Sequence, residues 1–493
     1  MQEFILQQKK RRLIEFLLEK NILIEPEFLE QLQLIQEPHK VSEFINKKLS
    51  SSEGSKEKTS GEHKQITKID GTVRVAFSYT GAPEKVSVQN FISYFNARYN
   101  SLKKILQQRV QLQNITSIAK LKAKAEKENV SIIGMVFSKE ATKNGNMVTL
   151  EDPTGLIKVF FSKNKADVNA KANDIVMDEV VGVSGMVGKG IIFANDLFFP
   201  DIPIMKEIKK SPVEEYALFI SDMHIGSKQF LENEFLKFIH WICGEIGSDK
   251  QKEIASKVKY IFITGDAVDG ISVYPSQKEE LTILTYREQY KKLAEFLQLI
   301  PSDIKIIISP GNHDVMPIAE PQPPIAEEYC PELWNMPNVI MVSNPAVVNI
   351  AARQGFPGFD VLMYHGYSYN HYADVVESIR AQKPNISERA DLVMKLLLQK
   401  RHLAPSYNGN PHLPTDNDYL IIEKVPDIFV SGDVHKSAVF TYKNVITGII
   451  GSCFQSRTSF QEKVGHVPDP GRIPIINLKT RDVKILNFVG GIE

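Results

Sequence analysis

This chain of 493 residues has few cysteines and no long hydrophobic run. Its three cysteines, Cys243, Cys330 and Cys453, are widely spaced and form no C-x-x-C pair. This excludes a disulfide framework and a cysteine-based zinc site, and it is typical of a reducing compartment. No apolar run approaches the roughly 18 residues needed to cross a bilayer, and the N-terminus lacks the apolar core of a secretory signal. We therefore expect a soluble, intracellular, cytoplasmic protein with no membrane partner.

Net charge is also absent. Lys and Arg number 59 and Asp and Glu number 59, so the formal charge is zero. This excludes a strongly basic, histone-like mode of nucleic-acid binding but leaves local basic patches open. The hydrophobic share of 43% and the charged share of 24% are typical of globular proteins. At about 150 residues per domain, the length predicts a multidomain chain with a sizeable core.

The first part of the chain is predicted to be helical. Residues 1–48 have apolar positions at helical spacing and predict a small helical module, whereas residues 49–66 are rich in Ser, Lys, Glu and Gly and predict a flexible linker. We expect residues 67–126 to form a helical connecting region whose long helix has Ser87 as its N-cap. Residues 101–130 carry a local net charge of +5, which fits a solvated helix face or a surface that touches DNA phosphates.

Residues 127–205 change to a strand pattern. Five short β-rich runs, separated by turns that contain Gly, Asn-Gly or Asp-Pro, predict a small Greek-key barrel of the OB type. Such a barrel could contact another subunit or a nucleic acid. Nucleic-acid binding needs exposed aromatic side chains among basic residues, and most aromatic residues here lie inside the strands. The sequence therefore favours a protein contact.

From residue 206 to residue 493, short buried strands alternate with helices. The apolar runs YALFIS, KYIFIT, IKIIIS, DVLMYH and DIFVSG are typical of strands that are buried on both faces. Polar residues follow each run directly. Ligand sites in open α/β sheets form at the carboxyl ends of strands, so this clustering predicts an active site.

These strand ends carry hard metal donors. They read Ser221-Asp222-Met223-His224, Gly265-Asp266, Gly311-Asn312-His313-Asp314, His365-Gly366 and Gly432-Asp433-Val434-His435. Taken singly, each has a structural alternative, such as a turn-forming aspartate or a hydrogen-bonded core histidine. Taken together, seven donors suit two adjacent cations: Asp222, His224, Asp266, Asn312, His365, Asp433 and His435. Carboxylate, amide and imidazole without thiolate favour Mn²⁺, Fe²⁺ or Zn²⁺ over Ca²⁺ or an all-oxygen Mg²⁺ site.

In this order, the motifs DMH, GD, GNHD, HG and GDVH resemble those of the calcineurin-like metallophosphoesterases. The resemblance implies a four-layer α/β/β/α domain that binds two divalent ions, with Mn²⁺ expected first and Mg²⁺, Fe²⁺ and Zn²⁺ as alternatives. It implies a first metal held by Asp222, His224, Asp266 and His435. It implies a second metal held by Asp266, Asn312, His365 and Asp433, with Asp266 as the bridge.

The same resemblance assigns roles to the GNHD motif. His313 matches the family histidine that faces the scissile phosphate without binding metal, and Asp314 matches the acid that orients it. Asp433 departs from the family, which usually has a histidine at this position. A carboxylate still binds a hard cation and adds negative charge, so the resemblance remains compatible with activity but leaves the metal preference open.

A narrower resemblance covers most of the chain. A helical N-terminus, a polar linker, an OB-like region and a phosphoesterase domain, together with the segments 400–407 and 452–478, resemble the small subunit of archaeal family D DNA polymerases. The resemblance implies a proofreading 3′→5′ exonuclease that acts on the DNA primer 3′ end, with a large catalytic subunit as partner and a nucleoid location during replication. Two alternatives stay open. One is a weakly active or inactive scaffold subunit, and the other is a stand-alone metallophosphoesterase nuclease or phosphatase.

Overall fold

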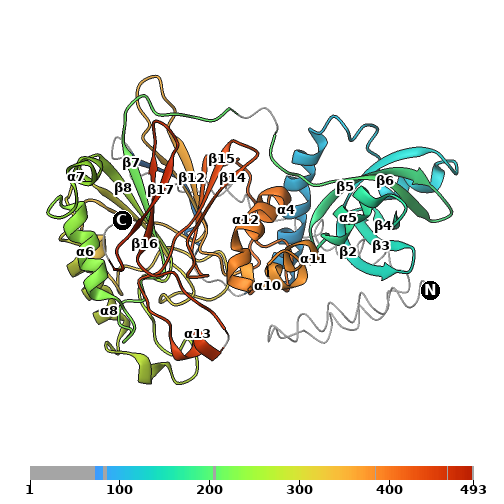
Figure 1. The fold of residues 1–493 in the computed structure, drawn as a ribbon. Helices are drawn as coiled ribbons and strands as arrows, with labels where there is room; N and C mark the ends of the chain where they lie inside the picture. Colours follow the sequence, from blue (N-terminus) through green and yellow to red (C-terminus); the bar gives the residue numbers. More distant parts are fainter. Residues whose placement is uncertain (1–72, 82–85, 204–206, 384, 464, 491–493) are drawn as a thin grey trace, which may run out of the picture. The chain divides into compact units, whose positions relative to one another are not determined.

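The computed structural model describes residues 73–81, 86–203, 207–383, 385–463 and 465–490. The predicted helical module of residues 1–48 and the predicted linker of residues 49–66 lie outside the described residues. The described part forms two compact units. The first comprises residues 86–200 with 414–421, and the second comprises residues 73–81, 201–413 and 422–490 (Figure 1). No helix in this part is long and apolar enough to cross a membrane.

The first unit is built on a small closed barrel, as the sequence predicts. Its strands run in the order β2-β3-β4-β6-β5. Their bounds are β2 (Asn129–Thr142), β3 (Gly145–Asp152), β4 (Gly155–Ser162), β5 (Val180–Val187) and β6 (Ile191–Phe198). Alternate residues of these strands fill the barrel interior. A short helix, α5 (Ala166–Asn173), connects β4 to β5, and η1 (Ile118–Ala123) precedes the barrel.

Helix α4 (Val88–Gln107) packs against the outside of β2 and β5. The Ser87 side chain accepts a hydrogen bond from the backbone N–H of Asn90, which confirms the predicted N-cap. The prediction that residues 67–126 are a helical connecting region is wrong for β1 (Val73–Ser78). This segment is a strand that pairs with β11 in the second unit, because cross-strand pairing with a distant segment overrides local preference.

A buried ion pair joins α4 to residues 414–421 within the first unit. Arg98 Nε lies 2.6 Å from Asp418 Oδ2, and both side chains are fully buried. Arg98 Nη2 also donates to Tyr94 Oη at 2.9 Å. Burial alone would lower the pKa of Arg98, but Asp418, Tyr94 and Asp178 together outweigh burial and raise it. The pair therefore stays ionised.

We expect Asp418→Ala to destabilise this unit by about 3–5 kcal/mol, because removing one partner leaves the other charge buried without compensation. Urea denaturation followed by circular dichroism measures the loss. Asp416→Ala is the matched control, since Asp416 is exposed on the same segment and should change stability by less than about 0.5 kcal/mol. Equal stability of the two variants would contradict the structural role of the pair.

The second unit contains two six-stranded sheets. The first sheet runs in the order β10 (Val339–Met341), β9 (Lys305–Ser309), β8 (Val258–Thr264), β7 (Tyr216–Ile220), β16 (Arg472–Asn477) and β17 (Val483–Asn487). The second sheet runs in the order β1, β11 (Ala346–Ile350), β12 (Phe359–Met363), β13 (Ile428–Ser431), β15 (Ile446–Ile450) and β14 (Ala438–Tyr442). The five predicted strands correspond to β7, β8, β9, β12 and β13.

Side chains from both sheets share one apolar core, so the sheets pack face to face. A second apolar core lies between the first sheet and its helices, which are α6 (Glu232–Ile242), α7 (Asp249–Ser256), α8 (Tyr286–Leu297) and α9 (Pro331–Trp334). Helix α12 (Ala390–Lys400) contacts β14 and β15 of the second sheet. The unit is thus layered as helices, sheet, sheet and helices (Figure 1).

The remaining elements of this unit are short. They are α10 (Tyr369–Val375), α11 (Glu377–Arg380), α13 (Ser459–Lys463), η2 (Gln277–Glu280) and η3 (Ile386–Arg389). The parallel strands β7, β8 and β9 end at one edge of the first sheet, and the parallel pair β12 and β13 lies in the second sheet. The loops that follow these five strands carry the predicted donors.

Candidate metal centre

The structure brings all seven predicted donors together. Asp222 and His224 follow β7, Asp266 follows β8, Asn312 follows β9, His365 follows β12, and Asp433 and His435 follow β13. Contacts between these side chains, given below, join residues up to 213 positions apart in the chain. The site therefore draws on both sheets of the second unit.

Five donors have backbones in the left-handed region. Their φ angles lie between 48° and 68°, and they are Asp222, His224, Asp266, Asp433 and His435. Few non-glycine residues adopt this region, and each instance costs free energy that the surrounding fold must offset. Such strain clusters at functional sites. The folded chain holds these five side chains in place at the expense of local backbone preference.

One group of donors surrounds His224 and His435. Their Nε2 atoms lie 3.1 Å apart, and His435 Nε2 lies 3.6 Å from Asp222 Oδ1. Asp266 Oδ2 lies 4.0 Å from His224 Nε2. Asp222, His224 and His435 are buried and near enough to one another to hold a metal ion.

A second group of donors surrounds His365. Its Nε2 atom lies 2.9 Å from Asn312 Oδ1, 3.3 Å from Asp266 Oδ2 and 3.8 Å from Asp433 Oδ1. Its Nδ1 atom donates to the carbonyl oxygen of Thr264 at 3.0 Å, which orients Nε2 toward the other donors. Asp266 is common to both groups.

Two glycines of the motifs lie so close to donor side chains that no other residue would fit. A Cβ atom on Gly265 would lie 2.2 Å from His365 Nδ1, and one on Gly311 would lie 2.3 Å from Asp266 Oδ1. Gly265 also has a φ of 82°, a conformation in which L side chains are strained. The glycines of the GD and GNH motifs thus leave the space that the donor side chains fill.

The electrostatics of the site favour a cation. Burial raises the pKa of Asp222 well above its usual range, and the charges of Asp266 and Asp433 add to this. Burial and the charge of Asp266 likewise raise the pKa of Asp433 to about 6. Burial also opposes the charge on Asp266, but His365 and His313 outweigh it and lower the pKa of that carboxyl. The site therefore holds three buried carboxyl groups with few positive charges near them, and a bound cation would compensate their charge.

The donor set fits a divalent ion. The Oδ2 atom of Asp433 is buried and has no hydrogen-bond partner among the described residues, an arrangement that usually has a functional cause. Burial and the neighbouring His224 lower the pKa of His435 well below its usual range, so its imidazole is neutral, as a ligand must be. These oxygen and nitrogen donors suit Mn²⁺, Fe²⁺ or Zn²⁺, but they do not distinguish among these ions.

We expect Mn²⁺ to raise the melting temperature of EDTA-treated protein, because a cation that binds only the folded state stabilises it by about 2.7 kcal/mol at one hundred times its Kd. Differential scanning fluorimetry over a Mn²⁺ titration measures this shift. The control is Asp303→Asn, which removes an exposed carboxylate at the amino end of β9, the end opposite to the donors, and should leave the shift intact. A melting temperature that does not change with Mn²⁺ up to millimolar concentration would argue against the site.

His313 lies beside the donors and is held through its main chain and its ring. Its backbone N–H donates to Asp266 Oδ1 at 2.8 Å, and its Nδ1–H donates to the carbonyl oxygen of Asp269 at 2.8 Å. The ring packs edge-on against His224 with centroids 4.7 Å apart. His313 also forms a third possible metal-binding group with His224 and Asp266. Neither of the two hydrogen bonds involves Nε2 of His313.

Asp314 is placed differently from the expectation that it orients His313. Its Oδ1 accepts from the Tyr290 hydroxyl at 2.8 Å, and its Oδ2 accepts from the Gly311 N–H at 2.8 Å. Burial and the charge of Asp266 raise its pKa to about 6. The carboxylate therefore braces the GNHD loop against α8, and the main chain of Asp269 orients His313 instead.

Asp269 is a residue that our sequence reasoning missed. Its Oδ1 lies 3.1 Å from His224 Nδ1 and accepts from Gln455 at 2.9 Å, and its Oδ2 accepts from Gln277 at 2.8 Å. Burial opposes its charge, but His224, His313 and Gln277 together outweigh burial and lower its pKa. Asp269 thus orients two histidines: its side chain contacts His224, and its main-chain carbonyl oxygen accepts from His313. Its spacing in the run GDAVD, three residues after Asp266, was the available signal.

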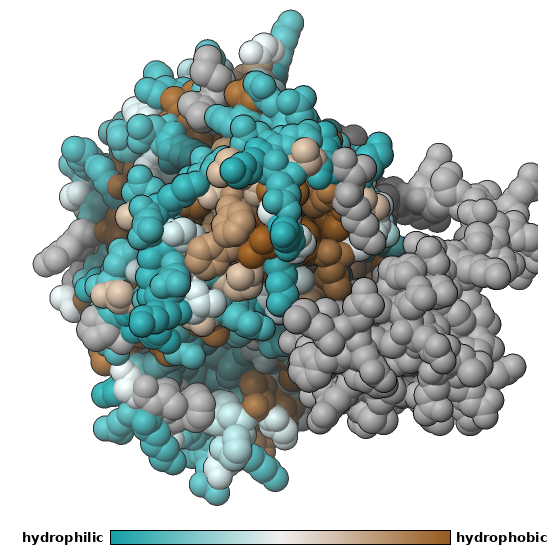
Figure 2. Space-filling view, turned by 90° about the vertical axis from the view of Figure 1, so that its right-hand side faces the viewer, coloured by the Kyte–Doolittle hydropathy of each residue, from teal (hydrophilic) through white to brown (hydrophobic). Residues whose placement is uncertain are grey.

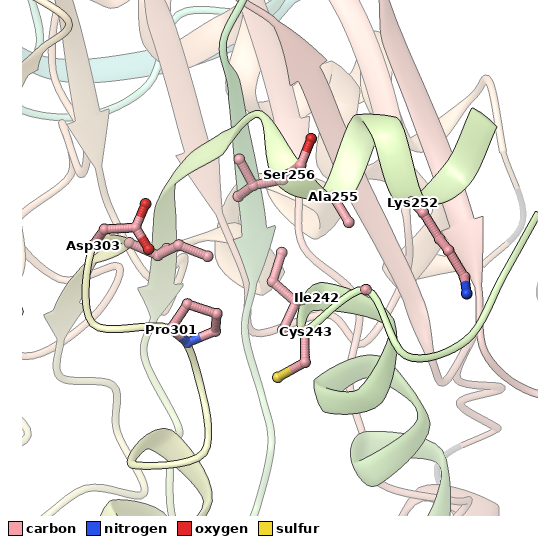
Figure 3. A pocket seen from close by; sticks show the side chains of 10 residues that line it. Ile242, Cys243, Lys252, Ala255, Ser256, Pro301 and Asp303 are labelled. Atoms are coloured by element: carbon pink, nitrogen blue, oxygen red, sulfur yellow. The ribbon is translucent and has the colours of Figure 1, made fainter. Parts of the chain in front are cut away.

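A separate pocket of about 190 Å³ lies at the opposite ends of the strands (Figure 3). Val258 opens β8 and Ile304 immediately precedes β9, so the pocket is at the amino ends of these strands, whereas the donors follow the carboxyl ends. Its lining mixes apolar residues with Lys252, Ser256 and Asp303. Asp303 is already paired with Lys259 at 2.7 Å. This pocket is distinct from the candidate metal centre.

Known proteins resemble this chain along most of its length. The family of the B subunits of DNA polymerases alpha and epsilon matches residues 217–441. The DNA polymerase II small subunit of Pyrococcus furiosus is 38% identical over 415 residues, which span 83% of this chain and 65% of that protein. The chain therefore matches just under two thirds of the length of that relative.

Other relatives are matched over more of their length. The DNA polymerase II small subunit of Methanothermobacter thermautotrophicus is 40% identical over 413 residues, 83% of this chain and 81% of that protein. The one of Thermoplasma acidophilum is 34% identical over 494 residues, 98% of this chain and 94% of that protein. Both matches are longer than the second unit, so each extends beyond it.

Proposed function

Because the chain belongs to the family of archaeal DNA polymerase II small subunits, those of the family D DNA polymerases, we propose that it is the metal-dependent 3′→5′ exonuclease subunit of such a polymerase. It would remove nucleotides from a DNA primer 3′ end and proofread for a large catalytic subunit during replication at the nucleoid. The observation that carries the proposal is the pair of donor groups that share Asp266, with His313 beside them.

The contacts support the division of the ligands that the resemblance implies, and Asp222 also lies near enough to Asp266 and His365 to share an ion with them. Asp222, His224, Asp266 and His435 would hold the first cation, and Asp266, Asn312, His365 and Asp433 would hold the second. The distances among the donors of each group, 2.9–4.0 Å, suit atoms that share a ligand sphere. When bound, two such cations orient a phosphodiester, withdraw charge from its oxygens and activate water.

The chain's own residues would complete the reaction. A water molecule would attack the phosphorus and lose one proton to the solvent, a P–O bond would form, and the bond to the 3′ oxygen of the preceding nucleotide would break. His313, protonated on both ring nitrogens, would donate its Nε2 proton to this departing oxygen while the Asp269 carbonyl holds its Nδ1–H. Asp266 would orient His313 through the backbone bond to its N–H while serving both donor groups.

The architecture supports the domain assignment that the resemblance implies. The barrel has five strands in the order β2-β3-β4-β6-β5, and helix α5 lies between β4 and β5 in the chain. This arrangement suits an OB-type domain at residues 127–205. Two facing sheets with helices outside suit a calcineurin-like phosphoesterase domain at residues 206–493. We propose that β1 belongs to the latter, since it adds an edge strand to the second sheet.

Digestion of a 5′-labelled primer tests the proposal. Matched and mismatched 3′ ends are incubated with the protein, alone and with the large subunit, in Mn²⁺, Mg²⁺ or EDTA. A metal-dependent ladder of shortened primers is expected, with faster removal of the mismatched nucleotide. If no ladder forms under any of these conditions, the chain is a scaffold subunit. Asp433→His then becomes the first variant to test, because it restores the histidine usual at this position.

A further inference from the structure

The outer surface of the barrel carries a continuous apolar row. Strand register places Met147 of β3 opposite Phe160 of β4, Phe160 opposite Phe193 of β6, and Phe193 opposite Met186 of β5. The residues that alternate with them along each strand are buried, so these four side chains point outward. Phe193 is 46% exposed and Met186 is 40% exposed. We call Met147, Phe160, Phe193 and Met186 the barrel row.

The space-filling view agrees with such a surface. Figure 2 shows, on the side of the molecule that carries the labels β3, β4 and β6 in Figure 1, hydrophobic residues that gather within a hydrophilic surround. Helix α4 packs on β2 and β5 through Ile133 and Val180. These residues lie away from Met186 along their strands. Helix α5 contacts β3, β4 and β6, and its buried Ala172 packs with the barrel interior, in a cluster that contains no residue of the barrel row.

The two aromatic rings of the row are ordered by their neighbours. Phe160 and Phe193 meet edge to face, with centroids 6.2 Å apart and planes at 83°. A Cβ atom on Gly188 would lie 2.8 Å from the Phe193 ring, so the turn between β5 and β6 approaches the ring closely. Phe193 is therefore a pre-positioned, half-exposed aromatic side chain, which loses little conformational entropy when it binds a partner.

Unpaired positive charges border the row. Lys158 lies two residues before Phe160 on β4, and Lys189 lies in the turn between β5 and β6. The backbone N–H of Lys127 donates to the carbonyl oxygen of Val187, next to Met186. All three lysines are exposed, and within the described residues none has an ion-pair partner. Neither β4 nor β5 contains an acidic residue, and Asp196 of β6 is paired with Lys171 at 2.8 Å.

We propose that the barrel row and these three lysines bind single-stranded nucleic acid. Bases would stack on Phe193 and Phe160, and backbone phosphates would lie beside Lys127, Lys158 and Lys189. Uncompensated ammonium groups next to exposed aromatic rings match a polyanion with flat apolar bases better than they match a neutral protein surface. The proposal depends on the first unit alone and stands apart from the proposed exonuclease.

Fluorescence anisotropy with a 5′-labelled oligo(dT) of twenty nucleotides tests the proposal on the full chain. The assay runs in EDTA at low ionic strength, so that no cation recruits DNA to the metal centre. Phe193→Ala is expected to weaken binding by about 5- to 150-fold, the usual loss of one stacked base, while Phe193→Tyr should bind nearly as well as wild type. Lys158→Gln should reduce the salt dependence by roughly 0.7 in log–log slope.

Ile485→Ala is the matched control, because Ile485 is an equally exposed apolar residue, 42%, on β17 of the second unit. Photocrosslinking with an iodouracil-containing oligonucleotide should place adducts on peptides that include residues 145–162 or 186–198. Unchanged affinity in Phe193→Ala, or adducts confined to the second unit, would overturn the proposal. Loss of large-subunit co-purification by Phe193→Ala with unaltered DNA affinity would also overturn it, since the row would then be a protein contact.

Discussion

His313→Ala should reduce primer digestion by about 10²–10⁴-fold, the usual contribution of a positioned general acid. The His313 ring lies beside the donors. Its Nδ1–H donates to the Asp269 carbonyl, so Nε2 is the ring atom that remains to act as the acid. Without it, the departing 3′ oxygen must take its proton from water. Single-turnover digestion of a 5′-labelled, mismatched primer in Mn²⁺ measures the loss.

The Mn²⁺-dependent melting shift distinguishes chemistry from structure in this variant. His313 is not in the two donor groups that share Asp266, so His313→Ala should keep most of that shift while losing hydrolysis. His240→Ala is the matched control, because His240 is an exposed histidine on α6 that pairs with Glu245. Wild-type rates in His313→Ala would remove the general acid from the mechanism. Loss of the melting shift together with activity would make His313 a ligand instead, as the third possible metal-binding group allows.

Asp266→Ala should lose both cations and all detectable hydrolysis. Its carboxylate is the atom group common to the two donor sets, 3.3 Å from His365 Nε2 and 4.0 Å from His224 Nε2. It also accepts the backbone N–H of His313. The surrounding histidines keep its pKa low despite burial, so it supplies a full negative charge to any bound cation. Elemental analysis of the metal-loaded, desalted protein measures the ion content.

Asp266→Asn separates the loss of charge from the loss of volume, because the amide fills the same space. It should show the same loss of ions, whereas Asp303→Asn should bind as many ions as wild type. Melting in EDTA checks that each variant is folded. Two ions per chain in Asp266→Ala would refute the bridging role. One retained ion would instead assign Asp266 to a single metal.

Local pattern was sufficient for much of the second unit. The strands β7, β8, β9, β12 and β13 are short and buried on both faces, so their sequences are continuous apolar runs with polar residues directly behind them. The carboxyl ends of these strands are where the chain leaves the sheets. Donors that follow such runs therefore had to be near a sheet edge, and their residue types alone indicated hard cations.

Other features depended on contacts between distant segments. β1 lies in a region that we predicted to be helical, and only its pairing with β11 makes it a strand. Residues 414–421 lie within the second half of the sequence, yet Asp418 is buried against Arg98 in the first unit. The local sequence pattern does not predict either pairing. In both cases the two partners are far apart in the chain, and each becomes buried only when the other packs against it.

Sequence motifs alone indicated the candidate donors, the strands that present them, the small barrel and the polymerase family. The contacts of each side chain depend on how distant segments pack in the folded chain. This packing turned the Asp314 carboxylate toward Tyr290 and gave Asp269 the contacts to His224 and His313. It also aligned Met147, Phe160, Phe193 and Met186, because strand order and register in a closed barrel are set by pairings that no single strand contains.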